Sequence, residues 1–332
     1  MKTSTRLRQL LKSDRILFRP GIGLAIHALM AEALGFEFVT VSGAQTSLHI
    51  LGLPDAGLIT MTEVAENVRR ISTAVNIPVV ADCDTGFGNA INVRRTVREI
   101  ISAGAAGLFF EDQVSPKRCG FVRGKEVVPV EEAVMKFAAA AQVRDELDPD
   151  FIIIARTDAR GAVGGSLEEA IARGKAYRDA GADVVYLEAL KSVDEIKVAA
   201  KAIGKPFFCT FVGLDPAPTL EELESWGICT AGGSMLPNIG LMKIWDLLAE
   251  IKKEGIAPYH NMIADTKGHP LGEFGVFDLT GFPRIQQLER EFLPAETVNK
   301  KSLSQGFYDP GVGHSRHAQT AEGFFNKKTF SL

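Results

Sequence analysis

The segment Val79-Val80-Ala81-Asp82-Cys83-Asp84-Thr85-Gly86-Phe87-Gly88 joins a β-branched apolar run to two carboxylates and a glycine-rich turn. A valine-rich run bounded by glycine is typical of a buried strand. We therefore expect Asp82 and Asp84 at the carboxyl end of that strand. Because a buried charge is costly unless it is paired or metal-bound, a hard cation such as Mg²⁺ would offset their repulsion. The alternative is a pair of solvated turn aspartates.

Seven other apolar runs resemble this strand, and segments with helical patterns separate most of them. The runs are Ile16–Gly21, Phe38–Gly43, Gly107–Asp112, Phe151–Asp158, Val184–Glu188, Pro206–Phe211 and Gly227–Gly233. Helix starts are marked by Thr60, Ser166 and Thr219, each followed three residues later by glutamate. Eight strands alternating with helices predict an α/β fold of the parallel (β/α)₈ TIM-barrel type. A doubly wound sheet is the weaker alternative, because no Gly-x-Gly-x-x-Gly turn follows an early strand.

The pattern changes beyond Met235, so we expect a catalytic barrel over 1–236 and a C-terminal extension over 237–332. Ile239–Glu254 and Phe282–Phe292 have helical periodicity. Gly268–Gly281 is rich in glycine, proline and phenylalanine and is expected to be irregular. The stretch Ser302–Leu332 has the composition of a mobile or partner-bound arm.

Composition narrows the function classes. The 332 residues are 46% hydrophobic and 23% charged, as in soluble globular proteins. A net charge of -4 gives no reason to expect nucleic acid or an anionic membrane as a partner. No apolar run approaches the roughly 20 residues of a membrane helix, and residues 1–19 lack the apolar centre of a signal peptide. The four cysteines have neither zinc-ligand nor redox-pair spacing, which predicts a reduced, cytoplasmic protein.

Polar residues follow several predicted strands, and in a barrel these strand ends face one mouth, where the active site lies. They are Ser42, Asp82, Asp84, Glu111, Arg156, Asp158 and Glu188. A single charge of this kind is usually part of a structural ion pair, but so many converging strand ends favour a functional site. Asp82, Asp84 and Glu111 supply oxygen ligands, and Arg156 offers a bidentate fork for a substrate carboxylate.

Cys119 lies in the long polar loop Gln113–Val128, directly after Lys117 and Arg118. Adjacent cations lower the pKa of a thiol, so a general acid–base or nucleophilic role is favoured over an incidental loop cysteine. His27 has the pattern of a structural histidine on an apolar helix, and His49 is a weak site candidate.

These residues together give the chain its resemblance to the isocitrate lyase/phosphoenolpyruvate mutase superfamily, and most closely to its methylisocitrate lyase-like branch. The matching stretches run in order from Arg19 to Leu236: Pro20-Gly21, Ser42-Gly43-Ala44, Gly52–Asp55, Asp82–Gly88, Ala105–Gln113, Lys117–Gly120, Ala155–Asp158 and Glu188.

The resemblance implies a (β/α)₈ barrel whose last helix swaps between subunits of a homotetramer. It implies Mg²⁺, for which Mn²⁺ could substitute, held directly or through water by Asp55, Asp82, Asp84 and Glu111. Further implied contacts to the substrate come from Ser42, Gly43, Ala44, Gly120, Phe121, Arg156 and Phe208, with catalytic roles for Cys119, Arg156 and Glu188. Ser42, Gly43 and Ala44 would bind the 2-oxo-acid end through main-chain groups and the hydroxyl.

Members with the lysine-arginine-cysteine-glycine loop are usually carbon–carbon lyases. Cleavage of a 2-hydroxy acid beside a carboxylate gives a 2-oxo acid, pyruvate or glyoxylate, and a carboxylate-stabilised carbanion. Arg156 would hold the emerging carboxylate, and Cys119 would deliver a proton to carbon. The family's mutases lack this cysteine, so Cys119 favours a lyase over phosphonopyruvate or phosphoenolpyruvate mutase chemistry.

The chain departs from the lyase pattern at four positions that are usually polar, where it has Phe109, Phe121 and, on the predicted seventh strand, Phe208 and Phe211. Repacking or a misalignment of that strand would explain this. The sharper hypothesis is a substrate with fewer carboxylates and more hydrocarbon than methylisocitrate, such as an alkyl-substituted malate. Other readings are an oxaloacetate hydrolase or decarboxylase, and a non-enzymatic barrel used as an oligomer scaffold.

Overall fold

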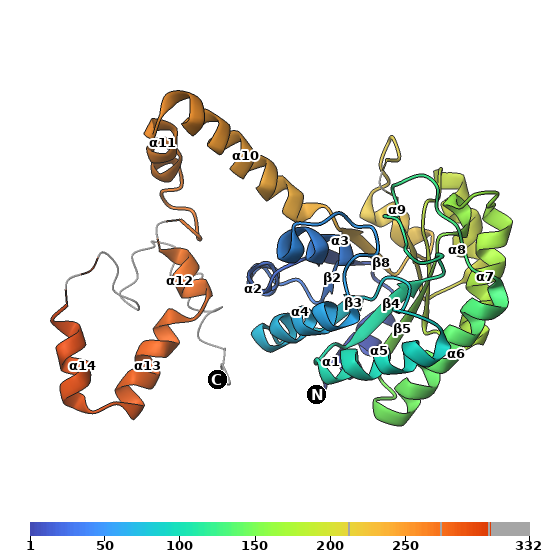
Figure 1. Ribbon diagram of the computed structural model, residues 1–332, viewed down its shortest axis with the longest axis horizontal. Helices are drawn as coiled ribbons and strands as arrows, with labels where there is room; N and C mark the ends of the chain where they lie inside the picture. Colours follow the sequence, from blue (N-terminus) through green and yellow to red (C-terminus); the bar gives the residue numbers. More distant parts are fainter. Residues whose placement is uncertain (212, 273, 305, 307–332) are drawn as a thin grey trace. The chain divides into compact units, whose positions relative to one another are not determined.

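The computed structural model describes residues 1–211, 213–272, 274–304 and 306, and the chain divides into two compact units, Met1–Pro237 and Asn238–Leu332. Each unit is considered by itself (Figure 1). Most of the arm expected from Ser302 onwards lies outside the described residues.

The first unit alternates strands and helices. Its elements are α1 (Thr3–Leu11), β1 (Leu17–Ile22), α2 (Ala25–Ala33), β2 (Val39–Val41), α3 (Gly43–Thr46), η1 (Ser47–Leu51), α4 (Met61–Ala74), β3 (Val79–Asp82), α5 (Ala90–Ser102), β4 (Gly107–Glu111), α6 (Val130–Leu147), β5 (Ile152–Thr157), η2 (Ala159–Gly161), α7 (Leu167–Asp179), β6 (Val184–Leu187), α8 (Val193–Ile203), β7 (Phe207–Cys209), α9 (Leu220–Ser225) and β8 (Thr230–Gly233).

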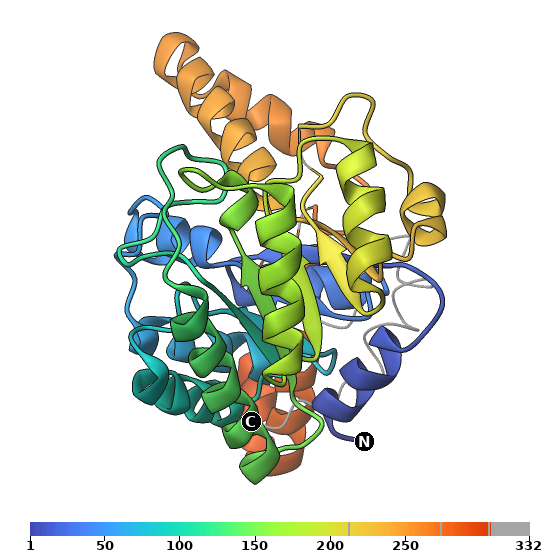
Figure 2. The ribbon, with the colours of Figure 1, turned by 90° about the vertical axis from the view of Figure 1, so that its right-hand side faces the viewer.

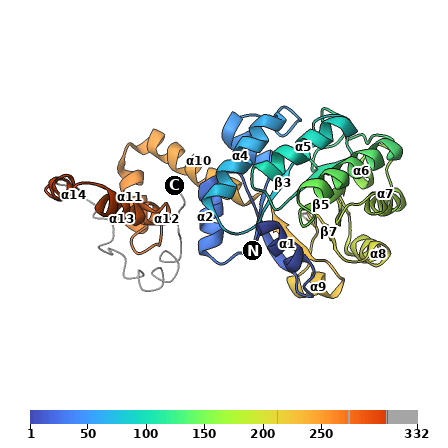
Figure 3. The ribbon, with the colours of Figure 1, turned by 90° about the horizontal axis from the view of Figure 1, so that it is seen from below.

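The eight strands form one all-parallel sheet in the order β7-β6-β5-β4-β3-β2-β1-β8. The Cys229 N–H donates to the Phe207 carbonyl at 3.0 Å and brings the two edges of the sheet together. The strands occupy the middle of the unit, and helices α4 to α8 lie outside them (Figures 2 and 3). The predicted TIM-type barrel is therefore confirmed, and the doubly wound alternative is wrong.

Packing between the strands and the helix layer holds the barrel together. The Phe137 ring on α6 stacks on Phe110 of β4 at 4.3 Å and lies 4.6 Å from Tyr177 of α7, and all three are buried. The predicted helix starts are confirmed, because the side chains of Thr60, Ser166 and Thr219 each accept a hydrogen bond from the third helical N–H.

Helix α1 was not expected from the polar N-terminus. Its buried side chains Leu7 and Leu11 line a small apolar cavity in the barrel interior together with Phe38 and Phe208. Its buried residues Ser4, Leu7 and Leu11 have helical spacing, but only one face of this short helix meets the barrel, so few apolar residues mark it in the sequence.

The second unit contains α10 (Leu236–Glu254), which starts in the last residues of the first unit, and α11 (Ala257–Asp265), α12 (Gly275–Leu279), α13 (Phe282–Phe292) and α14 (Ala295–Ser302). The expected irregular structure over Gly268–Gly281 is wrong in part, because α12 lies within it. Among the described residues, no helix is both long and apolar enough to cross a membrane.

Candidate active site

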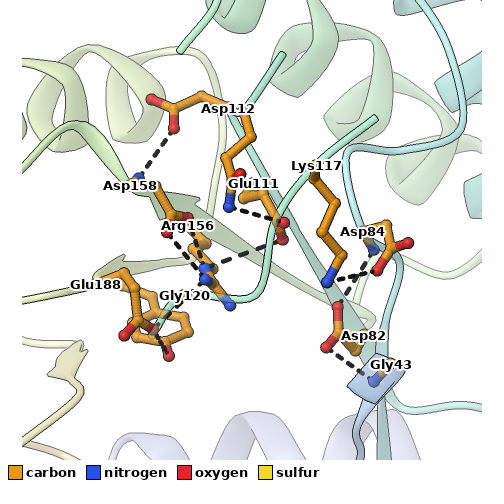
Figure 4. Close-up of polar contacts among 12 residues, drawn as sticks. Gly43, Asp82, Asp84, Glu111, Asp112, Lys117, Gly120, Arg156, Asp158 and Glu188 are labelled. Carbon is orange, nitrogen blue, oxygen red and sulfur yellow. Dashed lines mark hydrogen bonds and ion pairs between the residues drawn. The ribbon is translucent and has the colours of Figure 1, made fainter. Parts of the chain in front are cut away.

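Strand β3 delivers Asp82 and Asp84 to the barrel mouth as buried carboxylates. Asp82 Oδ2 accepts a hydrogen bond from the Gly43 N–H at 2.9 Å, and Asp82 Oδ1 accepts one from the Asp84 N–H at 3.2 Å (Figure 4). Asp84 itself has a φ of 46°, which turns its side chain away from the strand direction. The alternative of solvated turn aspartates is therefore wrong.

The N-terminus of α3 approaches these carboxylates closely. A Cβ on Gly43 would lie 3.0 Å from Asp84 Oδ1 and 3.1 Å from Asp82 Oδ2, so a larger residue here would require the two carboxylates to shift. Ser42 caps the helix by accepting from the Gln45 N–H. Ser42 and Ala44 line the pocket at the barrel mouth, as predicted for substrate contacts, whereas Gly43 contacts Asp82 behind them.

Lys117 links two candidate metal ligands, a role that the sequence did not indicate. Its ammonium lies 3.2 Å from Asp84 Oδ1 and forms an ion pair with Asp55, and it is buried. These carboxylates, with Glu111 and Asp82, raise the pKa of Lys117 against the opposing effect of burial. Lysine at the start of the cysteine loop is the signal that could have revealed the link.

Burial raises the pKa values of the carboxyl groups in this site, whereas it opposes the raised pKa of Lys117. It raises the pKa of Asp82, that of Glu111 well above its usual range, and that of Asp84 to about 6, while the positive charge of Lys117 partly counteracts it. Glu111 Oε2 makes no hydrogen bond to the described residues, whereas Asp84 Oδ1 lies 3.2 Å from the Lys117 ammonium. The nearest cation to Glu111 Oε2 is Arg156 Nε, at 4.0 Å. The site thus holds oxygen atoms that are ready to accept a cation.

Arg156 points into the pocket, but Asp158 occupies the fork expected to bind substrate. Arg156 Nε and Nη2 donate to the two Asp158 oxygens at 2.8 and 3.0 Å. Nη2 also lies 3.6 Å from Glu188 Oε2, so the guanidinium is held from two sides. The expectation of a free bidentate fork is wrong, and a substrate would meet the remaining donors of a fixed guanidinium.

Glu188 ends β6 and belongs to a hydrogen-bonded network at the pocket wall. Its Oε2 accepts from the Tyr186 hydroxyl and from Thr210 Oγ1, the latter at 2.7 Å. Tyr186 and Thr210 also contact each other at 2.7 Å between their oxygens. Neither was predicted as a site residue. Two-residue spacing in the strands Tyr186-x-Glu188 and Phe208-x-Thr210 could have shown that they share a face.

Phe208 was predicted to contact the substrate, but the residue of this strand segment that faces the mouth is Thr210, two positions later. Phe208 stacks on Tyr186 at 4.4 Å and lines the apolar interior cavity, not the mouth. Thr210, on the same side of the chain and nearer the strand's carboxyl end, faces the mouth instead. Phe109, Phe121 and Phe211 do line the pocket, so three of the four aromatic side chains are where the hypothesis needs them.

The Cys119 loop closes one side of the pocket, and its chemistry differs from expectation. Burial raises the pKa of the Cys119 thiol, helped by neighbouring Asp55, and Lys117 lowers it only weakly. Arg118 does not assist, because its guanidinium reaches the Arg123 carbonyl at 3.2 Å. The expected lowering of the thiol pKa by adjacent cations is therefore wrong, because burial raises this pKa.

Gly120 lets this loop come close to the charged wall. A Cβ there would lie 2.8 Å from Arg156 Nη2 and 2.9 Å from the Glu188 carboxyl carbon. The Gly120 carbonyl accepts a hydrogen bond from Lys125, which also pairs with Asp158 at 3.2 Å. The loop and the strand ends are thus tied into one wall.

Most of the predicted site residues meet at a single pocket. Its lining includes Ser42, Ala44, Asp55, Asp82, Lys117, Cys119, Gly120, Phe121, Arg156 and Glu188. Asp84 and Glu111 lie just behind this lining, in contact with Lys117 and Arg156. His49 is outside it, where its ring lies 5.5 Å from that of His27 and its Nδ1 contacts the Gln45 carbonyl.

The residues fit a divalent cation that keeps part of its water shell. No group of three histidine, cysteine, aspartate or glutamate side chains among the described residues is close enough to hold an ion alone. Mg²⁺ commonly uses one or two protein carboxylates, with water and substrate oxygens completing its shell. The carboxylate oxygens of Asp82, Asp84 and Glu111 meet this requirement, with Asp84 Oδ1 paired to Lys117 and Glu111 Oε2 without a hydrogen bond among the described residues.

Comparisons with known proteins agree with this geometry. Residues 7–235 match the family model described as phosphoenolpyruvate phosphomutase. The chain is 43% identical over 229 residues to the 2,3-dimethylmalate lyase of Eubacterium barkeri, covering 68% of this chain and 78% of the relative. It is 44% identical over 318 residues to the isocitrate lyase of Haloferax volcanii, covering 91% and 90%.

Solved structures match over most of both chains at lower sequence identity. A crystal structure of 2,3-dimethylmalate lyase matches with a TM-score of 0.79 at 28% identity, covering 88% of this chain and 95% of the other. A phosphonopyruvate hydrolase complex with oxalate and Mg²⁺ matches with a TM-score of 0.76 at 31% identity, covering 89% and 100%. The chain therefore belongs to the phosphoenolpyruvate mutase/isocitrate lyase superfamily.

Proposed function

We propose that this protein is a Mg²⁺-dependent carbon–carbon lyase. Its substrate is a substituted 2-hydroxy dicarboxylate, methylisocitrate-like or alkylmalate-like, and its products are pyruvate or glyoxylate and a second carboxylic acid. One observation carries the proposal: the buried carboxylate of Asp82, the carboxylate of Asp55 and the Cys119 thiol line the same pocket. The relatives named as lyases support the reaction class.

The carboxylates would hold the metal, with Asp82 and Asp84 nearest and Asp55 and Glu111 acting directly or through water. When bound, Mg²⁺ polarises the oxygens of the 2-oxo-acid fragment. Ser42 and Ala44, which line the pocket at the start of α3, would orient that fragment, with Ser42 acting through its hydroxyl. Mn²⁺, which shares the preference for oxygen ligands, would substitute.

The cleavage needs one proton to leave and another to arrive. A base at the barrel mouth takes the proton of the 2-hydroxyl, the electrons of that O–H bond form the new carbonyl, and the electron pair of the broken carbon–carbon bond passes to the departing fragment. Arg156 and Glu188, fixed by Asp158 and Tyr186, would position the carboxylate of that fragment. The Cys119 thiol would then donate its proton to the carbanion carbon, a step that requires the protonated form favoured by burial.

We also infer a homotetramer whose C-terminal helices exchange between subunits. Apolar side chains on α10 support this, because Ile244, Trp245 and Leu248 are all exposed in the single chain. Contiguous exposed apolar residues of this kind mark protein–protein contacts.

The function is tested with the metal-free protein, prepared with a chelator, and a panel of 2-hydroxy acids with and without Mg²⁺. We expect a 2-oxo acid and a second carboxylic acid in equal amounts, without CO₂, only when the metal is present. Quantification of both products by chromatography separates a lyase from a decarboxylase. If no 2-hydroxy acid is cleaved and oxaloacetate alone is consumed, the lyase proposal is wrong.

A further inference from the structure

Arg19 is a pocket residue that the proposed cleavage does not use. It lies on β1, is partly buried, and lines both the apolar interior cavity and the pocket that contains Cys119 and Arg156. Among the described residues its guanidinium makes one hydrogen bond, from Nη1 to Thr40 Oγ1 at 3.4 Å, and its buried Nε makes none. No carboxylate in the described part of the chain lies within ion-pair distance of it.

The surrounding residues make space for this side chain. A Cβ at Gly232 on the neighbouring strand β8 would lie 2.9 Å from Arg19 Cγ and 3.0 Å from Cζ. On its other side the guanidinium carbon lies 4.5 Å from the centroid of the Phe208 ring and 5.9 Å from that of Tyr186. A glycine and two aromatic faces thus hold the cation in a fixed place.

Arg19 differs from the other cations of this site, because each of those has a carboxylate partner. Lys117 pairs with Asp84, while Lys125 and Arg156 pair with Asp158. Burial opposes the charge of Arg19 and lowers its pKa. A cation kept in a partly buried wall without a partner costs stability unless an anion is supplied to it.

We propose that Arg19 binds a substrate carboxylate remote from the metal, and so selects a 2-hydroxy acid that carries a third carboxylate. This inference rests on the proposed lyase function. In that function the carboxylate cluster and α3 hold the 2-oxo-acid end, and Arg156 holds the carboxylate beside the broken bond. Arg19 then binds the third carboxylate of the substrate. Because this carboxylate stays on the departing fragment, the second product is a dicarboxylate. The three phenylalanines of the pocket by themselves favour a substrate with fewer carboxylates. We give more weight to the polar groups of Arg19, Tyr186 and Thr210, which favour a third carboxylate.

The proposal is tested by comparing Arg19→Met, which removes the charge and keeps the length, with Arg19→Lys, which keeps the charge. The substrates are isocitrate or methylisocitrate and an alkylmalate that lacks the third carboxylate. For Arg19→Met we expect kcat/KM on the tri-acid to fall at least about 30-fold, mostly through KM, as when one partner of a buried charge pair is removed. Activity on the alkylmalate should change by less than about threefold, and Arg19→Lys should recover part of the loss.

Arg15→Met is the matched control, because Arg15 is exposed and pairs with Glu37 outside the pocket. We expect its kinetics to stay within about twofold of wild type. Equal losses on both substrates, or none on the tri-acid, would overturn the role of Arg19 and leave the lyase function intact.

A second measurement uses the unaltered protein and does not depend on turnover. With Mg²⁺ present, calorimetry compares succinate with butyrate, which has the same chain length and one carboxylate fewer. We expect succinate to bind at least about tenfold more tightly, and the difference to shrink in Arg19→Lys. Equal affinities would overturn the proposal, even if the protein cleaves no 2-hydroxy acid and the lyase function itself fails.

Discussion

Helices α5 and α10 show how differently the two units of this chain use apolar side chains. On α5 the residues Val93, Val97 and Ile100 are completely buried within the barrel unit. On α10 no residue is buried, and Trp245 is 75% exposed. The barrel buries most of its apolar side chains within its own unit. The C-terminal helices expose apolar side chains, which a second protein surface could bury. We expect chemistry and monomer stability to reside in the barrel, and assembly in the C-terminal unit.

The largest expected effect tests whether the chemistry belongs to the barrel. Replacing Cys119 by alanine removes the proposed proton donor, and turnover should fall about 10²–10⁴-fold with the melting temperature preserved. Steady-state product release and thermal melts measure the two quantities. Cys229→Ala is the control, because that thiol is buried in the barrel interior and should be dispensable for turnover. Retained turnover in Cys119→Ala would refute the proposed protonation step.

The next effect compares one aromatic side chain from each unit. Phe137→Ala should lower the free energy of unfolding by about 3–5 kcal/mol, because the ring is buried between Phe110 and Tyr177. Phe292→Ala on α13 removes a ring that is 71% exposed and should cost less than about 0.5 kcal/mol in the monomer. Chemical denaturation measures both, and equal losses would break the comparison between the units.

A third change tests the assembly role of α10. Trp245→Ser should shift the protein from tetramer towards smaller species while the barrel remains folded. Sedimentation velocity and circular dichroism measure these properties. The control is Val163→Ser, which alters an equally exposed apolar residue, 74% exposed, on a barrel loop. A wild-type protein that is monomeric at micromolar concentration would contradict the proposed assembly.

The smallest effect concerns thiol reactivity. Cys83, Cys209 and Cys229 are buried, and Cys119 is partly exposed. We expect iodoacetamide to label Cys119 alone in the folded protein. Burial raises the pKa of this thiol, so the reactive thiolate is scarce at neutral pH and labelling should accelerate as pH rises. Peptide mass spectrometry follows each site. Labelling of Cys119 at neutral pH as fast as in the protein unfolded by guanidinium would contradict the protective effect of burial.

Several parts of this protein could be predicted from residue order alone, because they depend on local patterns. Eight apolar runs separated by capped helices are sufficient to predict the barrel, and the polar residues that end five of them place Asp82, Glu111, Arg156 and Glu188 at one mouth. Strand periodicity and helix capping are short-range effects that a sequence displays directly.

Other features depend on which side chains the closed barrel brings together. The sequence neighbours of Cys119 indicate a lowered thiol pKa, but the fold turns Lys117 towards Asp55 and Asp84 and buries the sulfur, so the pKa is raised. Three further features depend on how β1, β6, β7 and β8 come together. They are the interior position of Phe208, the hydrogen-bonded network around Thr210 and the lack of a carboxylate partner for Arg19. Electrostatic interactions depend on distance in space and on burial, and residue order alone specifies neither of these.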